Sequence, residues 1–269
     1  AVLLLIKTRF IAISAVKSLF LKARLSPKKR IKPRKNNQMQ EYKKIGIIVA
    51  DDEEFKPLAD LVTRGEFSES YFLKRKILNF KTGKADVYAC FCGIGKVNAA
   101  AAAAHFVDMG CEIMLNYGLS GGIDGVRRGD ICVCSRFLEH DFDLTGIGYK
   151  PCEKPWQEYI YNADKHLNSR ILSLLPGAVT GTAVTGDCFV TDDNLRERLK
   201  NDFGAVCCDM ETAAIAYVCY YAGVPFAAVR RISDDAGAGA GDVYREMNNS
   251  GETVLSDFIL ECARLAAEL

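Results

Sequence analysis

Short apolar runs alternate with amphipathic stretches along the chain from about residue 44 onward. Runs typical of buried strands lie at residues 44–50, 71–80, 86–92, 112–118, 130–139, 178–184, 205–210 and 225–233. Helical spacing of apolar residues fills a segment that ends near Val62, and then residues 96–109, 211–223 and 244–269. Strands interleaved with helices predict one α/β domain, a three-layer sandwich with a central mixed, mostly parallel sheet. Because ligands of such sheets bind beyond the strand ends, polar residues there are the first candidates for a site.

The first forty residues differ in character from the rest of the chain. Residues 1–40 contain 11 of the 35 Lys and Arg residues and no acid, which leaves residues 41–269 with 24 bases, 34 acids and a net charge of −10. No apolar run in residues 1–40 approaches the roughly 18–20 residues that span a bilayer. Their basic, Ser-containing composition is typical of an organellar transit peptide, and a basic amphipathic surface helix is a further alternative.

Met39 directly precedes the first predicted strand, whereas the chain itself does not begin with Met. We therefore favour an upstream extension or cloning remnant over a transit peptide for residues 1–38. This interpretation predicts a basic N-terminal extension over residues 1–40 and a folded domain over residues 41–269. The acidic domain lacks the basic face that nucleic acid requires, so neither nucleic-acid binding nor a stable membrane association is expected.

All 11 cysteines lie between Cys90 and Cys262, mostly within apolar segments. An odd number of cysteines in such positions does not suit a disulfide framework, and many free thiols favour a reducing compartment. We therefore expect a cytoplasmic protein, or an organellar one if residues 1–38 are a genuine transit peptide. The pairs Cys90/Cys92 and Cys132/Cys134 would each point to one face of a strand. With only three His in the chain, a metal site lacks partners at suitable spacing, so the favoured role is buried packing, and no metal or cofactor is predicted.

Five short polar or glycine-containing segments follow the predicted strands. They are residues 51–54, 93–96, 118–122, 209–211 and 233–235. The turn at 93–96 lacks the third glycine of a dinucleotide-binding fingerprint, so a tight turn that starts a helix beside the sheet is the favoured interpretation.

Seven segments, in order along the chain, resemble the motifs of one family. They read KIGIIVADDEE, GIGKVNAA, NYGLSGG, HDFDLTGIGY, VTGDCFV, DMETAAIA and VRRISD. With these segments, residues 44–267 resemble the nucleoside phosphorylase and nucleosidase superfamily, and within it most closely the 5′-methylthioadenosine/S-adenosylhomocysteine nucleosidases. The resemblance implies hydrolysis of the N-glycosidic bond of 5′-modified adenosines, with release of adenine.

Cleavage of this bond passes through an oxocarbenium-like sugar and leaves negative charge on the purine, so it calls for a proton donor at N7 and a carboxylate that activates water. The resemblance implies that Asp234 is the general acid, for which it needs a raised pKa. It also implies that Glu54 activates water and that Glu211 takes the ribose 2′- and 3′-hydroxyls, whose hydrogen bonds strengthen as positive charge develops. The alternative for Glu54 and Asp234 is an ordinary capping role at a helix or turn.

The resemblance also implies a set of residues that bind the substrate. Met210 would pack beneath the ribose, Phe189 and Val190 would flank the purine, and Tyr244 would lie against the sugar. Arg230 matches a residue near the catalytic water, and Ser233 matches a hydrogen-bond partner of the loop that carries the acid.

The loop with His140, Asp141, Asp143 and Thr145 helps to form the dimer in relatives, and Ile147 is the expected equivalent of a residue lent to the neighbouring pocket. A homodimer with a shared active site is therefore expected.

Two positions depart from the family pattern. Leu119 stands where relatives carry a hydroxyl residue that helps to hold the attacking water or phosphate, and Ser120 lies one residue further on. A local shift could let Ser120 substitute, so Ser120 is counted among the substrate-binding candidates. Asp209 stands where many relatives have Glu, and its shorter arm is expected to alter a supporting contact rather than to remove the site.

Phosphorolytic relatives usually carry a G-D-P-x-R-type loop after the first strand, whereas this chain has the acidic VADDEE, which would repel phosphate. Water is therefore the favoured nucleophile. A phosphate-dependent purine nucleoside phosphorylase, or a nucleosidase for another base or 5′ group, is the first alternative. The alternative from another class is a nucleoside-binding or storage protein with little turnover, which Leu119 alone favours.

Overall fold

The computed structural model describes residues 44–83, 85–250, 256–266 and 268. The predicted basic extension over residues 1–40 lies outside these described residues. In chain order the strands are β1 (Lys44–Val49), β2 (Phe67–Phe72), β3 (Arg75–Thr82), β4 (Ala85–Phe91), β5 (Ile113–Gly122), β6 (Ile131–Glu139), β7 (Ile160–Asn162), β8 (Val179–Thr185), β9 (Ala205–Asp209) and β10 (Phe226–Asp234). The helices are α2 (Asp52–Val62), α3 (Lys96–Asp108), α4 (Lys165–Leu174), α5 (Asp193–Phe203), α6 (Thr212–Ala222), α7 (Ala240–Ser250) and α8 (Ser256–Ala266), with a 3₁₀ turn η2 (Thr145–Ile147).

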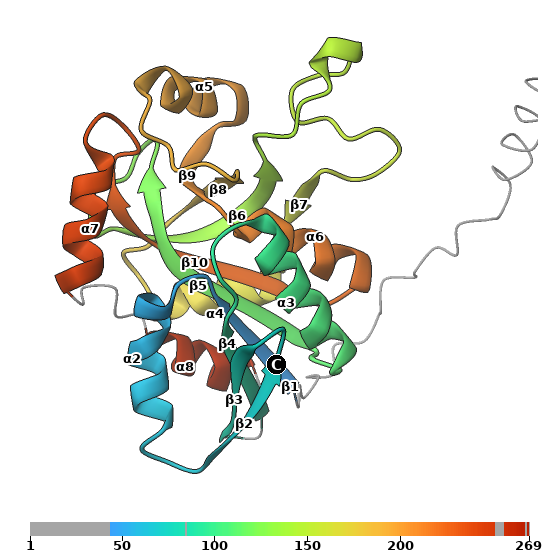
Figure 1. Ribbon diagram of the computed structural model, residues 1–269, viewed down its shortest axis with the longest axis vertical. Helices are drawn as coiled ribbons and strands as arrows, with labels where there is room; N and C mark the ends of the chain where they lie inside the picture. Colours follow the sequence, from blue (N-terminus) through green and yellow to red (C-terminus); the bar gives the residue numbers. More distant parts are fainter. Residues whose placement is uncertain (1–43, 84, 251–255, 267, 269) are drawn as a thin grey trace, which may run out of the picture. The chain divides into compact units, whose positions relative to one another are not determined.

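The strands form one sheet in the order β10-β6-β8-β9-β5-β1-β4-β3-β2, with β7 paired to β6 (Figure 1). A further pairing of β10 with β5 closes β5, β10, β6, β8 and β9 into a ring. Among the described strands five ladders are parallel and five are antiparallel, so the sheet is mixed. The alternation of strands and helices predicts fewer antiparallel ladders than are present. Three of the five involve β2, β3 or β7, which join the sheet without a crossover helix, and the other two pair β10 with β6 and β5 with β9.

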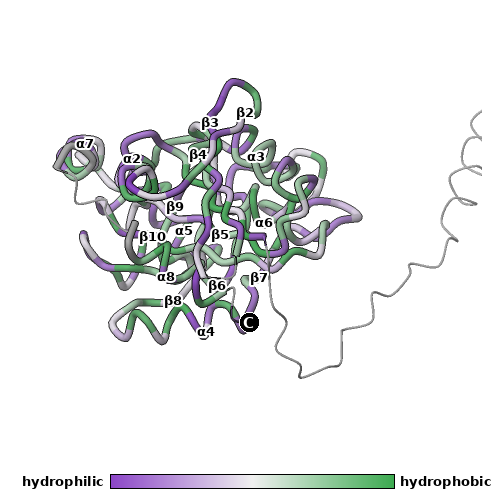
Figure 2. Tube along the Cα trace, turned by 90° about the horizontal axis from the view of Figure 1, so that it is seen from below, coloured by the Kyte–Doolittle hydropathy of each residue, from purple (hydrophilic) through white to green (hydrophobic). Residues whose placement is uncertain are grey.

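Two apolar clusters separate the layers of the domain. On one side, α3 and α6 contribute the Ala-rich faces that pack on the sheet, together with Phe106 and Ile215. On the other side, α2, α4 and α8 pack through larger residues such as Leu58, Ile171 and Ile259. Hydrophobic residues follow the strands through the middle of the body, whereas hydrophilic residues gather in the outer turns (Figure 2). These clusters produce the three layers that the sequence predicts.

The strand predicted over residues 71–80 is instead the turn and part of both arms of a hairpin. β2 and β3 pair antiparallel with Phe72 opposite Arg75, so only Leu73 and Lys74 form the loop. Both loop residues have positive φ, 45° and 62°, as a two-residue turn of this type requires. Because neither residue is Gly or Asn, the sequence gives no turn signal here.

Two helices are missing from the sequence prediction, and one predicted helix is divided. α4 and α5 are amphipathic and mainly polar, and each begins at an aspartate, Asp164 or Asp192, whose side chain accepts hydrogen bonds from the first helical N–H groups. The helix predicted over residues 244–269 is divided into α7 and α8, and residues 251–255 between them lie outside the description.

All 11 cysteines fall within the described residues and are free thiols, ten of them buried and Cys188 exposed. No helix in the described part of the chain is both long enough and apolar enough to cross a bilayer.

Candidate active site

A cavity lies where β5, β9 and β10 end, and it collects nearly all of the residues that the sequence singles out. Glu54 comes from α2, Ser120 from β5, Ser233 and Asp234 from β10, and Tyr244 from α7. The connections after β8 and β9 supply the remaining predicted residues, which are Phe189, Val190, Met210 and Glu211. Of the ten residues predicted for the site, only Arg230 does not line the cavity.

Glu54 is the most strongly perturbed carboxyl group of the cavity. Its Oε1 accepts a hydrogen bond from the backbone N–H of Leu119 at 2.9 Å, while Oε2 is buried and has no hydrogen-bond partner among the described residues. Burial raises the pKa of Glu54 to about 8, although the Leu119 N–H and the positive charge of Arg230 act in the opposite direction. A buried carboxyl with one free oxygen and a pKa near neutrality can accept a proton from a polar group in the cavity.

α2 positions Glu54 in its first turn. Asp51 caps the helix by accepting from the N–H of Glu53 at 2.8 Å, and Asp52 and Glu53 are exposed. The four consecutive acids thus have different roles: Asp51 caps the helix, and Glu54, not Glu53, is the buried one.

Glu211 lines the same cavity from a position just before α6. Its Oε1 accepts the backbone N–H of Gly95 at 2.8 Å, so the turn at residues 93–96 supports a carboxyl group 116 residues further along the chain. Burial raises the pKa of Glu211 to about 7, the nearby negative charge of Asp209 adds to the effect, and Arg230 opposes it. 

Asp234 lies at the end of β10 with both carboxyl oxygens anchored. Ser233 Oγ donates to Oδ2 at 2.6 Å, and the Ala236 N–H donates to Oδ1 at 2.9 Å. Burial raises the pKa of Asp234, whereas these two hydrogen bonds lower it. The side chain is therefore fixed in direction and shifted toward the protonated form.

Arg230 lies beneath the cavity, fully buried, and organises its floor. Its Nε is 3.1 Å from Asp209 Oδ2, and its Nη2 donates to Asn116 Oδ1 at 2.5 Å. Asp209 Oδ1 in turn accepts from Thr185 Oγ1 at 2.7 Å and from the N–H groups of Glu211 and Thr212 at 3.0 Å. Asp209 thus ties β8, β9, β10 and the start of α6 together.

Gly118 leaves the space that the side chains of Arg230 and Glu54 occupy beside β5. A Cβ at Gly118 would lie 2.6 Å from Arg230 Nη1 and 2.7 Å from Glu54 Oε2. Both distances are far below van der Waals contact, so a larger residue here would displace both side chains.

The aromatic side of the cavity is formed by Phe189 and Tyr244. Their rings pack edge to face, with centroids 5.4 Å apart and planes at 68°. Phe189 is 45% exposed and therefore offers an accessible aromatic face, whereas the neighbouring Val190 is buried.

Leu119 and Ser120 both line the cavity and both are buried. The hydroxyl of Ser120 makes no hydrogen bond to any residue of the described chain. A buried, unpaired hydroxyl at a cavity wall is available to a bound molecule.

Sequence reasoning missed the second layer of this site. Asn116, Thr185 and Thr212 hold Arg230 and Asp209, yet they lie within strands or at a helix start and look like ordinary structural residues. Gly95 supports Glu211 through its backbone, which leaves no side-chain signal. Ile147, predicted for the dimer, is exposed on η2 and does not line the cavity.

The comparisons identify the family to which this fold and site belong. The family model of the phosphorylase superfamily matches residues 44–266. A 5′-methylthioadenosine/S-adenosylhomocysteine nucleosidase of Geobacillus sp. (strain WCH70) is 31% identical over 226 residues, which cover 81% of this chain and 96% of that protein.

Solved structures agree with this result. The 5′-methylthioadenosine/S-adenosylhomocysteine nucleosidase from Helicobacter pylori, solved with butyl-thio-DADMe-Immucillin-A, has a TM-score of 0.77 at 25% identity and covers 83% of this chain and 99% of its own. Futalosine hydrolase of Helicobacter pylori strain 26695 has a TM-score of 0.77 at 23% identity, over 82% and 97% of the two chains, a likeness of fold alone.

A closed mixed sheet with helices on both faces, and buried carboxyls around one cavity, defines an α/β enzyme. The chain belongs to the phosphorylase superfamily and, within it, to the 5′-methylthioadenosine/S-adenosylhomocysteine nucleosidases. The fold class, the family and the enzyme class predicted from the sequence are thereby confirmed.

Proposed function

We propose that this protein hydrolyses the N-glycosidic bond of 5′-methylthioadenosine, S-adenosylhomocysteine or a similar 5′-modified adenosine, with release of adenine. The observation that carries the proposal is the convergence of Glu54, Glu211 and Asp234 on one cavity. They come from three distant parts of the chain, and burial raises the pKa of each. The names of the relatives described above support the substrate class.

In this proposal Asp234 donates its proton to the purine N7 as the glycosidic bond breaks. The hydrogen bonds from Ser233 and Ala236 keep the carboxyl in one orientation, and its raised pKa favours the protonated form needed for donation. Adenine then leaves as a neutral base, because it keeps the electron pair of the broken bond at N9 and carries the transferred proton at N7.

Glu54 accepts a proton from the water that attacks the anomeric carbon. Its free Oε2 is the acceptor, and the Leu119 N–H fixes the other oxygen. Arg230 limits the rise in the pKa of Glu54, so that a useful fraction of the group is ionised near pH 8. Each turnover leaves Glu54 with one extra proton and Asp234 with one fewer. Glu54 then releases its proton to solvent and Asp234 takes one up, which restores the starting state.

Glu211 binds the ribose hydroxyls, with Met210 beneath the sugar. A carboxylate that accepts two hydroxyl hydrogen bonds stabilises the positive charge that develops on the ring, so these bonds favour the transition state. Phe189 and Tyr244 offer aromatic surface to the purine and the sugar, and Val190 lies behind the base.

Water is the proposed nucleophile because the nearby wall is acidic. Asp51 and Glu54 both line the cavity on this side, and the negative charge of Asp51, joined by that of Glu54 when this group is ionised, would repel a phosphate dianion. In place of the usual hydroxyl at Leu119, we propose that Ser120 contributes its unpaired hydroxyl to the substrate or the water.

We further propose a homodimer that completes the site. Ile94 lines the cavity and is 53% exposed, and the neighbouring Val97 at the start of α3 is 80% exposed. Ile147 is 71% exposed on the segment between β6 and β7, which extends away from the sheet (Figure 1). Apolar side chains presented in this way beside a polar cavity suit burial against a second copy.

The test is adenine release from 5′-methylthioadenosine by the purified protein, measured with and without phosphate. We expect release without phosphate, with free 5-methylthioribose as the second product. Release that needs phosphate and yields a ribose 1-phosphate would replace hydrolysis with phosphorolysis. Binding of the nucleoside without any release of base, from this or related nucleosides, would instead support the binding-protein alternative.

A further inference from the structure

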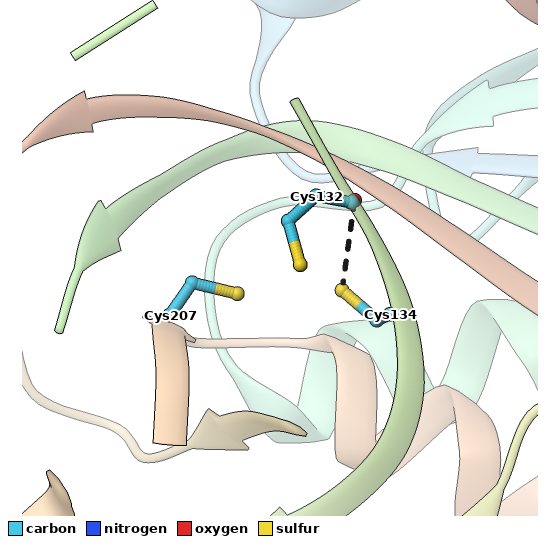
Figure 3. A group of neighbouring side chains, drawn as sticks. All are labelled: Cys132, Cys134 and Cys207. Atoms are coloured by element: carbon cyan, nitrogen blue, oxygen red, sulfur yellow. Dashed lines mark hydrogen bonds between the residues drawn. The ribbon is translucent and has the colours of Figure 1, made fainter. Parts of the chain in front are cut away.

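Three cysteine side chains meet inside the closed part of the sheet, and none of them lines the cavity. Cys132 and Cys134 lie two residues apart on β6, and Cys207 lies on β9 (Figure 3). Their sulfur atoms lie within 4.8 Å of one another and point toward a common centre, and all three residues are completely buried. None of them forms a disulfide.

We propose that Cys132, Cys134 and Cys207 form a binding site for a thiophilic d¹⁰ metal ion, Cu(I) in particular, coordinated by three sulfur atoms. A metal–sulfur bond of about 2.3 Å in a trigonal arrangement separates the sulfurs by about 4 Å. Sulfurs already within 4.8 Å of one another need only a small adjustment to reach this geometry.

The number of ligands favours Cu(I) over zinc. No His, Asp or Glu joins the three sulfurs in the described part of the chain. On the neighbouring strands the residues opposite Cys134 are Ala228 and Gly181, and the residue opposite Cys207 on β8 is Ala183, none of which has a ligating side chain. Structural zinc takes four ligands in a tetrahedron, whereas soft thiolates select Cu(I), which accepts three.

Arg230 provides positive charge beside the group. It lies directly opposite Cys132 in the β10–β6 ladder and is fully buried. Metal binding would release the thiol protons as thiolate–metal bonds form, and the guanidinium of Arg230 would offset part of the resulting negative charge.

The sequence alone favours a packing role for these cysteines because Cys132 and Cys134 supply only two ligands. The third ligand comes from a strand more than 70 residues away along the chain, and only closure of the sheet brings it near.

The test is the copper content of the whole protein, produced in copper-supplemented cells so that the buried site can load during folding. After removal of loosely bound metal under anaerobic, reducing conditions, we expect about one copper per chain, with sulfur-to-Cu(I) charge-transfer absorption in the ultraviolet. Cys207→Ala and Cys134→Ala should each lose the bound copper. Cys219→Ala, which removes a buried thiol outside the group, and Cys188→Ala, which removes the exposed one, should retain it.

If the wild-type protein binds no copper under these conditions, the proposal is wrong, whatever the variants do. Copper that is lost in Cys188→Ala but kept in Cys207→Ala would assign the binding to the surface thiol and also overturn it. A parallel preparation in zinc-supplemented cells should contain no stoichiometric zinc, and one zinc per chain that depends on Cys207 would refute the three-coordinate Cu(I) site. Thermal unfolding of each variant verifies that the protein is folded.

Discussion

Leu119 holds Glu54 through its main chain: the Leu119 N–H donates to Glu54 Oε1 at 2.9 Å. The resemblance to the family implies a hydroxyl side chain at this position, but the backbone contact does not depend on which side chain is present. Leucine here therefore leaves the proposed base held in place.

If Ser120 supplies that hydroxyl, Ser120→Ala should lower kcat about 10- to 100-fold, the equivalent of losing one hydrogen bond to a reacting group. Adding Leu119→Ser to the Ser120→Ala protein should recover much of the rate, since it restores a hydroxyl at the family position. Steady-state measurement of kcat for the single and the double variant tests whether Ser120 supplies the hydroxyl. Wild-type turnover in Ser120→Ala would remove Ser120 from the site.

Glu54→Gln should lower kcat by a factor of about 10² to 10⁴, the usual contribution of a general base. Glu53→Gln is the matched control, because Glu53 is exposed on the same turn of α2 and should leave the rate nearly unchanged. Equal losses in both variants would argue that the acidic turn acts only through its total charge.

The raised pKa of Glu54 also makes a prediction about stability. In the unfolded chain the group titrates near 4.5, and in the folded protein at about 8, so the folded state binds more protons between these values. The stabilising effect of the proton is therefore complete below pH 4.5 and is lost as the pH rises through 8. Glu54→Gln should accordingly be more stable than wild type at pH 9, by on the order of 5 kcal/mol, and the difference should shrink toward pH 5.

Urea unfolding at pH 5 and pH 9 measures this difference, with Glu53→Gln again as the control. A constant offset between wild type and Glu54→Gln at both pH values would contradict a raised pKa in the folded protein.

Asp234→Asn should reduce kcat by about three orders of magnitude or more while the nucleoside still binds, because the amide keeps the shape of the side chain but cannot donate a proton of comparable acidity. Asp235→Asn is a close control, since Asp235 is the next residue and is exposed. Isothermal titration with 5′-methylthioadenosine separates binding from turnover. A near-wild-type rate for Asp234→Asn would eliminate the proposed general acid.

Gly118→Ala should impair both activity and stability. The added methyl group would lie 2.6 Å from Arg230 Nη1 and 2.7 Å from Glu54 Oε2, so these two groups must move apart. We expect a loss of about 1–3 kcal/mol in unfolding free energy, the usual cost of overpacking, together with a fall in kcat. Gly177→Ala is the matched control, because a Cβ there meets no atom within 4 Å and, as at Gly118, φ is not positive.

Much of the fold could be predicted from the sequence, and the resemblance to the family supplied nine residues that line the cavity. β1 is an almost continuous apolar run and β10 begins as one, and the polar residues that follow each run mark the strand ends. The hairpin of β2 and β3 was hidden because Leu73 and Lys74 adopt positive φ without a glycine. Helices α4 and α5 were missed because their apolar residues are few, and their aspartate caps carry the signal instead.

The supporting contacts of the site could not be predicted, because they depend on strand register. Arg230 reaches Asp209 and Asn116 only after β10 pairs with β5 and β9 joins the same ring. No spacing along the chain encodes a contact between residues 230 and 116. For the same reason, the sequence does not show that Cys207 lies beside Cys132 and Cys134, which the folded sheet brings together.

The hairpin of β2 and β3 also determines how the sheet ends. β3 covers the hydrogen-bonding groups of β4, and β2 forms the outer strand, where Glu69 is paired with Lys76 at 2.6 Å. Charged side chains on an outer strand discourage another chain from adding its own strand. Without the hairpin, the apolar strand β4 would be the edge of the sheet, so we infer that the hairpin protects β4 from self-association although it contributes no residue to the cavity.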